Sequence, residues 1–241
     1  MRRRGRPTRW TIARSSQVWT VIGQQGTAQA SGSGKMRDQR RSDGGPPSLK
    51  APADPTVSVI VTCYNYGHFT QDCLESILGQ TCPPSQVIVV DDGSTDATGR
   101  VLEGYGSRIE LLRTDNRGQA AAFNVGFARS TGNIVIFVDA DDLLRPDAID
   151  VILYHWSDDL AVLTFGLETI DGAGHSTGVH AASIRSSAGD NRPELLSTGA
   201  FSSPPTTGNA FSRRLLERVL PMPEPRWRIS ADCYLIRAAA L

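Results

Sequence analysis

The chain has 241 residues, of which 39% are hydrophobic and 21% are charged, which is enough apolar material for one or two globular domains. Lys and Arg together number 25, as do Asp and Glu, so the formal net charge is zero and the chain lacks the overall basic excess of a nucleic-acid-binding protein. The sequence has no apolar run near the roughly 20 residues that span a bilayer, and its four cysteines, none in a Cys-x-x-Cys pair, exclude a disulfide scaffold.

The charge is unevenly distributed along the chain. Residues 1–56 hold eleven basic and three acidic side chains, a net charge of +8, so the remainder carries −8. This segment is rich in Arg, Ser, Gly, Gln and Pro and shows no sustained hydrophobic period, so we expect residues 1–56 to form a disordered basic leader. A targeting segment, a basic tail that touches anionic lipid, and a misassigned start with Met36 as the true first residue are the alternatives.

Strands and helices alternate after residue 56. Short β-branched or apolar runs predict buried strands, and amphipathic or alanine-rich stretches predict helices between them. The predicted strands are 57–62, 87–90, 109–112, 134–138 and 162–165, and the predicted helices are 69–78, 97–102, 118–129 and 146–156. Strands that are apolar on both faces and alternate with helices indicate an α/β fold, with a mainly parallel sheet covered by helices on both faces.

The pattern loosens after Phe165. Residues 167–170 and 176–179 predict a hairpin, and the polar residues 181–206 predict a long loop of the kind that closes over a site. A strand at 208–211 and helices at 213–219 and 232–241 follow. The chain stops inside the last helical pattern without a C-cap residue, so we expect it to be truncated at the C-terminus.

Three acidic features occupy informative positions. Asp91-Asp92-Gly93 and Asp139-Ala-Asp-Asp142 each follow a predicted buried strand directly, where open parallel sheets bind ligands. Asp232 stands where the last helix begins. Each has an ordinary explanation by itself: a turn, a solvated acidic cluster, and an acid favoured by the helix dipole. Clustered carboxylates are also the hard oxygen ligands that suit Mg²⁺ or Mn²⁺.

Four motifs in one order resemble glycosyltransferase family 2, the inverting, nucleotide-sugar-dependent enzymes of GT-A fold. These motifs are Val57-Ser-Val-Ile-Val-Thr-Cys-Tyr-Asn65, Asp91-Asp-Gly-Ser-Thr-Asp96, Asn116-Arg-Gly118 with Asn124 and Gly126, and Phe137-Val-Asp-Ala-Asp-Asp142. The resemblance covers residues 57–238. It implies a GT-A (Rossmann-like) fold in which residues 57–165 form the nucleotide-sugar-binding half and residues 166–241 form an incomplete acceptor-side half.

The resemblance also implies roles for individual residues. Those matched to the nucleotide site are Thr62, Tyr64, Asn65, Asp91, Asp92, Asn116, Arg117, Gly118 and Asp139. Asp139 and Asp141 match the D-x-D motif that holds Mg²⁺ or Mn²⁺. Asp232 matches the catalytic base, although Ala231 stands where the family commonly has Glu.

The implied reaction moves a sugar from a nucleotide diphosphate, with a UDP-sugar favoured, to a saccharide, lipid-linked or protein acceptor. The resemblance further implies a role in cell-wall or polysaccharide biosynthesis. We expect a cytoplasmic location, with possible peripheral association at the inner face of the membrane, and no nucleic-acid partner. Two alternatives stay open: a sugar-phosphate nucleotidyltransferase, and a degenerate domain that binds nucleotide without transferring sugar.

Overall fold

A computed structural model describes residues 9–12, 20–23, 55–171, 175–180, 192–198 and 204–239. Most of the predicted leader, 1–56, and most of the predicted loop, 181–206, therefore lie outside the described residues. Within them, every strand and helix predicted between residues 57 and 241 is present, with boundaries that differ by a few residues.

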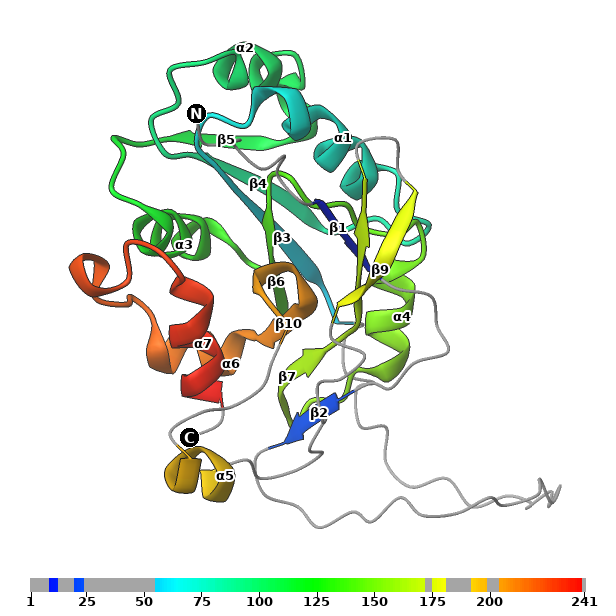
Figure 1. Ribbon diagram of the computed structural model, residues 1–241, viewed down its shortest axis with the longest axis vertical. Coiled ribbons are helices and arrows are strands. Elements are labelled where there is room, and N and C mark those ends of the chain that lie inside the picture. Colours follow the sequence, from blue (N-terminus) through cyan, green and yellow to red (C-terminus); the bar gives the residue numbers. More distant parts are fainter. Residues whose placement is uncertain are drawn as a thin grey trace, which may run out of the picture.

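Four parallel strands form one part of the central sheet. They are β3 (Val57–Cys63), β4 (Gln86–Asp91), β5 (Glu110–Arg113) and β6 (Ile134–Asp139). β3 pairs in parallel with both β4 and β6, and β4 pairs in parallel with β5. The acidic sequences that follow β4 and β6 therefore emerge on either side of the end of β3, at the same edge of the sheet (Figure 1).

Antiparallel strands extend the sheet beyond β6. β10 (Asn209–Ser212) lies between β6 and β7 (Leu160–Thr164) and is antiparallel to both, and β2 (Thr20–Gly23) is antiparallel to β7. The seven described strands of this sheet follow the order β2-β7-β10-β6-β3-β4-β5. Since β7 runs in the direction of β6, five of them point the same way, which confirms the predicted mixed, mainly parallel sheet.

Helices cover both faces of the sheet (Figure 1). α1 (Gly67–Leu78), α2 (Thr98–Glu103) and α4 (Ala148–His155) contribute to the core on one face. α3 (Gln119–Arg129), α6 (Arg213–Val219) and α7 (Ala231–Ala239) contribute to the core on the other. The remaining helical segments in the described part of the chain are α5 (Arg192–Thr198) and three 3-10 turns, η1 (Gly106–Arg108), η2 (Thr206–Gly208) and η3 (Glu224–Arg226).

The period of two along β3 sends its side chains into both cores. Val59 and Val61 belong to the core beneath α1 and α4, while Ile60 belongs to the core beneath α3 and α7, and all three are fully buried. A strand buried on both faces has no polar face. This is why the sequence reads as a continuous apolar run rather than an alternating one.

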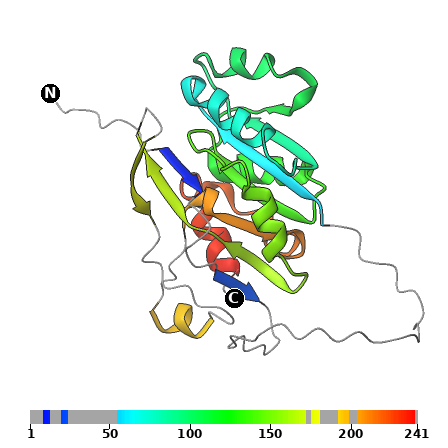
Figure 2. The same cartoon turned by 90° about the vertical axis from the view of Figure 1, so that its right-hand side faces the viewer.

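A second, smaller sheet contains the predicted hairpin. β8 (Leu167–Ile170) pairs antiparallel with β9 (Ser176–His180), and β1 (Arg9–Ile12) adds to the free edge of β8 (Figure 2). β1 and β2 both fall within residues 1–56, so these eight residues differ from the disorder predicted for that segment. Composition did not predict them because their backbone hydrogen bonds are supplied by strand edges 137 to 161 residues away in the sequence.

No helix among the described residues is both long enough and apolar enough to cross a membrane.

Candidate functional site

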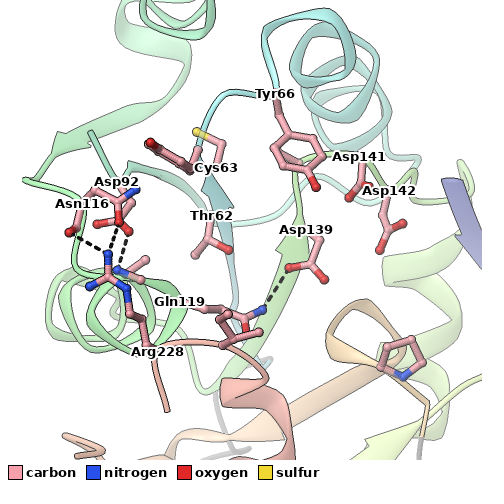
Figure 3. A pocket seen from close by; sticks show the side chains of 16 residues that line it. Thr62, Cys63, Tyr66, Asp92, Asn116, Gln119, Asp139, Asp141, Asp142 and Arg228 are labelled. Carbon is pink, nitrogen blue, oxygen red and sulfur yellow. Dashed lines mark hydrogen bonds between the residues drawn. The ribbon is translucent and has the colours of Figure 1, made fainter. Parts of the chain in front are cut away.

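A cavity of about 740 Å³ opens at the carboxyl ends of β3, β4 and β6 (Figure 3). Residues from six separate parts of the sequence line it: Thr62, Cys63, Tyr64, Tyr66, Asp92, Asn116, Gly118, Gln119, Ala122, Asp139, Ala140, Asp141, Asp142, Pro205, Arg228 and Ile229. Seven of the eleven predicted nucleotide, metal and base residues are among them, and the other four, Asn65, Asp91, Arg117 and Asp232, are not.

Asp92 organises the loop on one side of the cavity. Its Oδ1 accepts hydrogen bonds from the Thr114 hydroxyl and the Arg117 N–H, each at 3.0 Å, and its Oδ2 accepts from the Gly118 N–H at 2.6 Å. A carboxylate that accepts several such bonds is held in one orientation. Asp92 therefore fixes the backbone of residues 114–118 and still faces the cavity.

Three of the predicted nucleotide residues support the cavity from outside. Asn65, at φ 60°, accepts from the Thr95 N–H at 2.8 Å, and Asp91 accepts from the Ser94 N–H at 2.9 Å. Arg117 directs its guanidinium to Glu224, at 3.2 Å. These side chains do not line the cavity because those of Asn65 and Asp91 point into the loop that follows β4, and that of Arg117 points to the segment that follows α6.

Glycine at position 118 is required by both conformation and space. Its φ of 93° is in the left-handed region that disfavours side chains. A Cβ there would lie 2.4 Å from Cγ of Arg228 and 2.5 Å from the carbonyl oxygen of Arg228. The close approach lets the Arg228 carbonyl accept from the Gln119 N–H at 2.9 Å, while its guanidinium donates to Asn116 Oδ1 at 2.6 Å. Arg228 thus brings a cation to the side of the cavity lined by Asn116 and Gly118.

The opposite side of the cavity is acidic. Burial is the main cause that raises the pKa of Asp139 to about 7, and the charges of Asp141 and Asp232 raise it further, against hydrogen bonds from Thr206 and Gln119 that lower it. The Tyr66 ring points toward the same carboxylates (Figure 3). Burial, followed by the charges of Asp141, Asp139 and Asp142, raises the pKa of Tyr66, so its hydroxyl stays protonated at neutral pH.

Residues before β10 anchor this acidic segment. The Thr207 hydroxyl accepts from the Asp139 N–H at 3.2 Å and donates to the buried carboxylate of Asp142. Asp142 thereby has a structural partner, and it lines the cavity together with Asp139 and Asp141. The second half of the chain thus holds the acidic end of β6 in place.

Asp232 begins α7 beside this cluster. It is half-buried and lies near enough to Asp139 for its charge to raise the pKa of that carboxyl, although it is not among the lining residues. Ala231 is fully buried in the core beneath α7. A Glu at position 231 would place a charge in that core.

The donor set fits a hard divalent cation in part. Asp139 and Asp141 offer carboxylate oxygens whose mutual repulsion a cation would relieve. The described residues contain no group of three His, Cys, Asp or Glu side chains arranged to hold a metal. Two carboxylates suit Mg²⁺ or Mn²⁺ where water and substrate phosphates supply the remaining ligands.

Sequence reasoning missed Gln119, Arg228 and Tyr66 as residues of this cavity. Gln119 directly follows the Asn116-Arg-Gly118 motif, so its position was available as a signal. Tyr66 follows Tyr64-Asn65 in the same way. Arg228 lies 112 residues from its partner Asn116 and belongs to no local pattern that could have identified it.

Comparisons with known proteins agree with this architecture. The sequence profile described as "Glycosyl transferase family 2" matches residues 58–220. An uncharacterized glycosyltransferase of Nostoc sp. is 36% identical over 191 residues, which are 76% of this chain and 59% of that protein. A chondroitin synthase of Escherichia coli is 35% identical over 111 residues, 45% of this chain and 16% of that protein.

Solved structures share the fold. The crystal structure of Staphylococcus aureus TarS residues 1–349 in complex with UDP superposes with a TM-score of 0.54 at 23% sequence identity, and the match covers 76% of this chain and 55% of that chain. The chain thus spans between a sixth and three fifths of the length of these relatives. At this identity the likeness establishes a mainly parallel α/β fold of GT-A type.

Proposed function

Since this chain belongs to glycosyl transferase family 2, we propose that it transfers a sugar from a nucleotide-diphosphate donor to an acceptor hydroxyl, with inversion at the anomeric carbon. One observation carries the proposal. Asp139 and Asp141 line one side of the cavity, and Arg228, a cation, lines the other. Asp232 lies close enough to Asp139 for its charge to raise the pKa of that carboxyl, so three carboxylates are grouped beside the cavity. This arrangement supports a site with separate places for a diphosphate and for a hydroxyl that loses a proton.

The nucleotide occupies the side of the cavity formed by Thr62, Tyr64, Asp92 and the 116–118 loop. Asp92 holds the loop through three hydrogen bonds and presents its remaining lone pairs to the base and ribose. The half-exposed Tyr64 ring offers an apolar surface for stacking at the mouth of the cavity. The UDP in the TarS complex makes UDP-sugars the first donors to test.

Asp139 and Asp141 would hold Mg²⁺ or Mn²⁺ against the donor diphosphate. The cation, when bound, supplies positive charge that stabilises the departing diphosphate. The positive charge of the cation would also offset the repulsion between Asp139 and its neighbours Asp141 and Asp232, which lets Asp139 remain ionised at neutral pH.

Asp232 accepts the proton of the acceptor hydroxyl. The oxygen of the acceptor hydroxyl then attacks the anomeric carbon from the face opposite the diphosphate. The bond between that carbon and the diphosphate breaks, and the configuration inverts without a covalent enzyme intermediate. The Asp232 carboxylate is half-buried in the first turn of α7, so it is held by the helix and is partly exposed to solvent. Saccharide, lipid-linked and protein hydroxyls all fit this chemistry.

The first test is the substitution Asp232→Asn, which keeps the shape of the side chain and removes its basicity. We expect transfer from the best UDP-, GDP- or dTDP-sugar to fall by about 10²–10⁴-fold, the contribution of general-base catalysis, while the dissociation constant for the nucleoside diphosphate changes less than about threefold. Transfer is measured by release of nucleoside diphosphate in the presence of an acceptor panel, and binding by titration calorimetry.

Asp158→Asn is the matched control. Asp158 is exposed and precedes β7, at the edge of the sheet opposite the cavity. Its substitution removes one negative charge, as Asp232→Asn does, but at a position away from the cavity. Equal loss of transfer and nucleotide binding in Asp232→Asn would contradict the role of base. Nucleotide binding by the parent chain without transfer or hydrolysis of any donor would favour the non-catalytic alternative.

A further inference from the structure

Gln119 connects the two sides of the site. It is the first residue of α3, and its side-chain amide reaches three other segments. Its Oε1 accepts from the Ala231 N–H at 2.9 Å, and its Nε2 lies 3.4 Å from the Thr206 hydroxyl. The same Nε2 lies 3.4 Å from Asp139 Oδ1 (Figure 3). One side chain therefore links the acidic end of β6, the segment before β10 and the start of α7.

The contact with Ala231 fixes the start of the helix that carries Asp232. The first N–H groups of a helix have no partner within it, so they need an acceptor from elsewhere. Gln119 supplies that acceptor for Ala231, whose side chain is fully buried in the core beneath α7. Backbone and side chain of Ala231 are thus both held, which leaves the adjacent Asp232 little freedom to move relative to α3.

The other end of the amide faces Asp139. An amide has one acceptor end and one donor end, and here the N–H of Ala231 must meet the oxygen, so the NH₂ group is directed to the carboxylate. Neither Glu nor Leu reproduces both ends: Glu accepts from Ala231 but cannot donate to Asp139, and Leu does neither. Gln119 is also joined by its backbone to Arg228, the cation on the nucleotide side.

We propose that Gln119 is a positioning residue that sets Asp232 against Asp139, so that the base and the donor-binding carboxylate are held in one geometry. The proposal rests on the function proposed above, since the distance it fixes is that between the base and the donor. Misplacement of a reacting group by about 1 Å costs up to about 10²-fold in rate without a comparable loss of binding. The expected signature is therefore a fall in kcat with nearly constant affinity for nucleotide.

Two substitutions separate the two ends of the amide. For Gln119→Leu, which removes both, we expect kcat to fall by about 10–100-fold while the dissociation constant for UDP with Mn²⁺ changes less than about threefold. For Gln119→Glu, which keeps the acceptor for Ala231 but adds a negative charge beside Asp139, we expect weaker UDP binding in the absence of a divalent cation and a smaller loss of kcat than in Gln119→Leu.

Gln80→Leu is the matched control. Gln80 is a buried glutamine that also joins separate segments: its Nε2 donates to the carbonyls of Ser76 and Arg145, and its Oε1 accepts from the Ile149 N–H at 3.0 Å. It lies after α1, outside the cavity. We expect its loss to lower stability and leave kcat and nucleotide affinity unchanged per folded molecule.

Hydrogen exchange supplies a measurement that does not depend on activity. We expect the Ala231 amide and its neighbours at the start of α7 to exchange about five- to tenfold faster in Gln119→Leu, the factor for one lost hydrogen bond, and at the parent rate in Gln119→Glu and Gln80→Leu. Parent-like exchange at α7 in Gln119→Leu, or equal loss of kcat in Gln119→Leu and Gln80→Leu, would overturn the proposal. A parent chain inactive on every donor would overturn the proposed function alone, because the exchange pattern still decides whether Gln119 holds α7.

Discussion

Asp139 shows how one residue in this site is placed at a cost to stability. Burial and two neighbouring carboxylates raise its pKa from 3.8 to about 7, so the folded chain binds a proton at pH values where the unfolded chain has released it. The stabilisation that the folded chain gains from protonated Asp139, relative to the ionised form, is therefore fully present below about pH 4 and is lost as the pH rises through about 7. Such cost is typical of residues kept for binding rather than stability.

The substitution Asp139→Asn tests this directly. Without divalent cations, we expect the variant to be more stable than the parent at about pH 8 by up to about 4 kcal/mol, since the pKa is raised from 3.8 to about 7 and one pKa unit corresponds to about 1.4 kcal/mol, and similar in stability at about pH 4. Urea unfolding at a series of pH values gives both numbers. Asp158→Asn controls for the loss of one negative charge, and a parent-like stability at pH 8 for Asp139→Asn would refute the electrostatic account.

At the scale of elements, the site depends on how closely α3 packs against β3 and β4. Gly126 makes this approach possible, because a Cβ there would lie 2.4 Å from Cγ2 of Ile60 and 3.2 Å from Cγ2 of Val90, both fully buried. α3 carries Gln119 at its first position and is held at the other side by Asn124, which exchanges two hydrogen bonds with Met222. The packing at Gly126 therefore sets where Gln119 meets the carboxylates.

Gly126→Ala is expected to lower the free energy of unfolding by about 1–3 kcal/mol, the usual cost of overpacking a core. The matched control is Gly99→Ala in α2, where a Cβ would meet its nearest atoms at 3.8 and 3.9 Å. There, we expect a change between zero and a gain of about 1 kcal/mol, since Ala is the better helix former. Thermal unfolding of both variants decides the matter, and equal effects would show that the approach of α3 is not tight.

At the scale of the whole molecule, the site is assembled from both halves of the chain. Arg228 and Ile229, which precede α7, line a cavity whose strands come from the first half, and Thr206 and Thr207 hold the acidic end of β6. β10 places these threonines by entering the sheet between β6 and β7. A ligand at the cavity would therefore stabilise the folded chain as one unit.

We expect Mn²⁺ and UDP together to raise the melting temperature by more than the sum of their separate effects. Binding to the folded state alone stabilises by about 2.7 kcal/mol at a ligand concentration of 100 times Kd, and a diphosphate beside Asp139 and Asp141 would strengthen cation binding. Asp141→Asn should abolish the excess, whereas Asp158→Asn should retain it. Additive shifts in the parent chain would contradict joint binding at this cavity.

Local patterns of the sequence were enough for the strands, the helices and the acidic strand ends. β3, β4 and β6 are continuous apolar runs because they are buried on both faces, and parallel pairing brings Asp92 and Asp139 to one edge of the sheet. These features depend on neighbours in sequence and on one rule of sheet geometry. They could therefore be predicted without knowing any contact between distant segments.

Long-range contacts decided which of the predicted residues line the cavity and which support it from outside. Asn65 and Asp91 stand in the same motifs as Tyr64 and Asp92 but point into loops, and Arg228 and Gln119 enter the site through partners about 112 residues away. The place of β10 between β6 and β7 follows no pattern within its four residues. Side-chain direction at a loop and the choice of a strand's neighbour depend on packing of the complete chain, because the backbone groups and charges that decide them come from segments far apart in sequence.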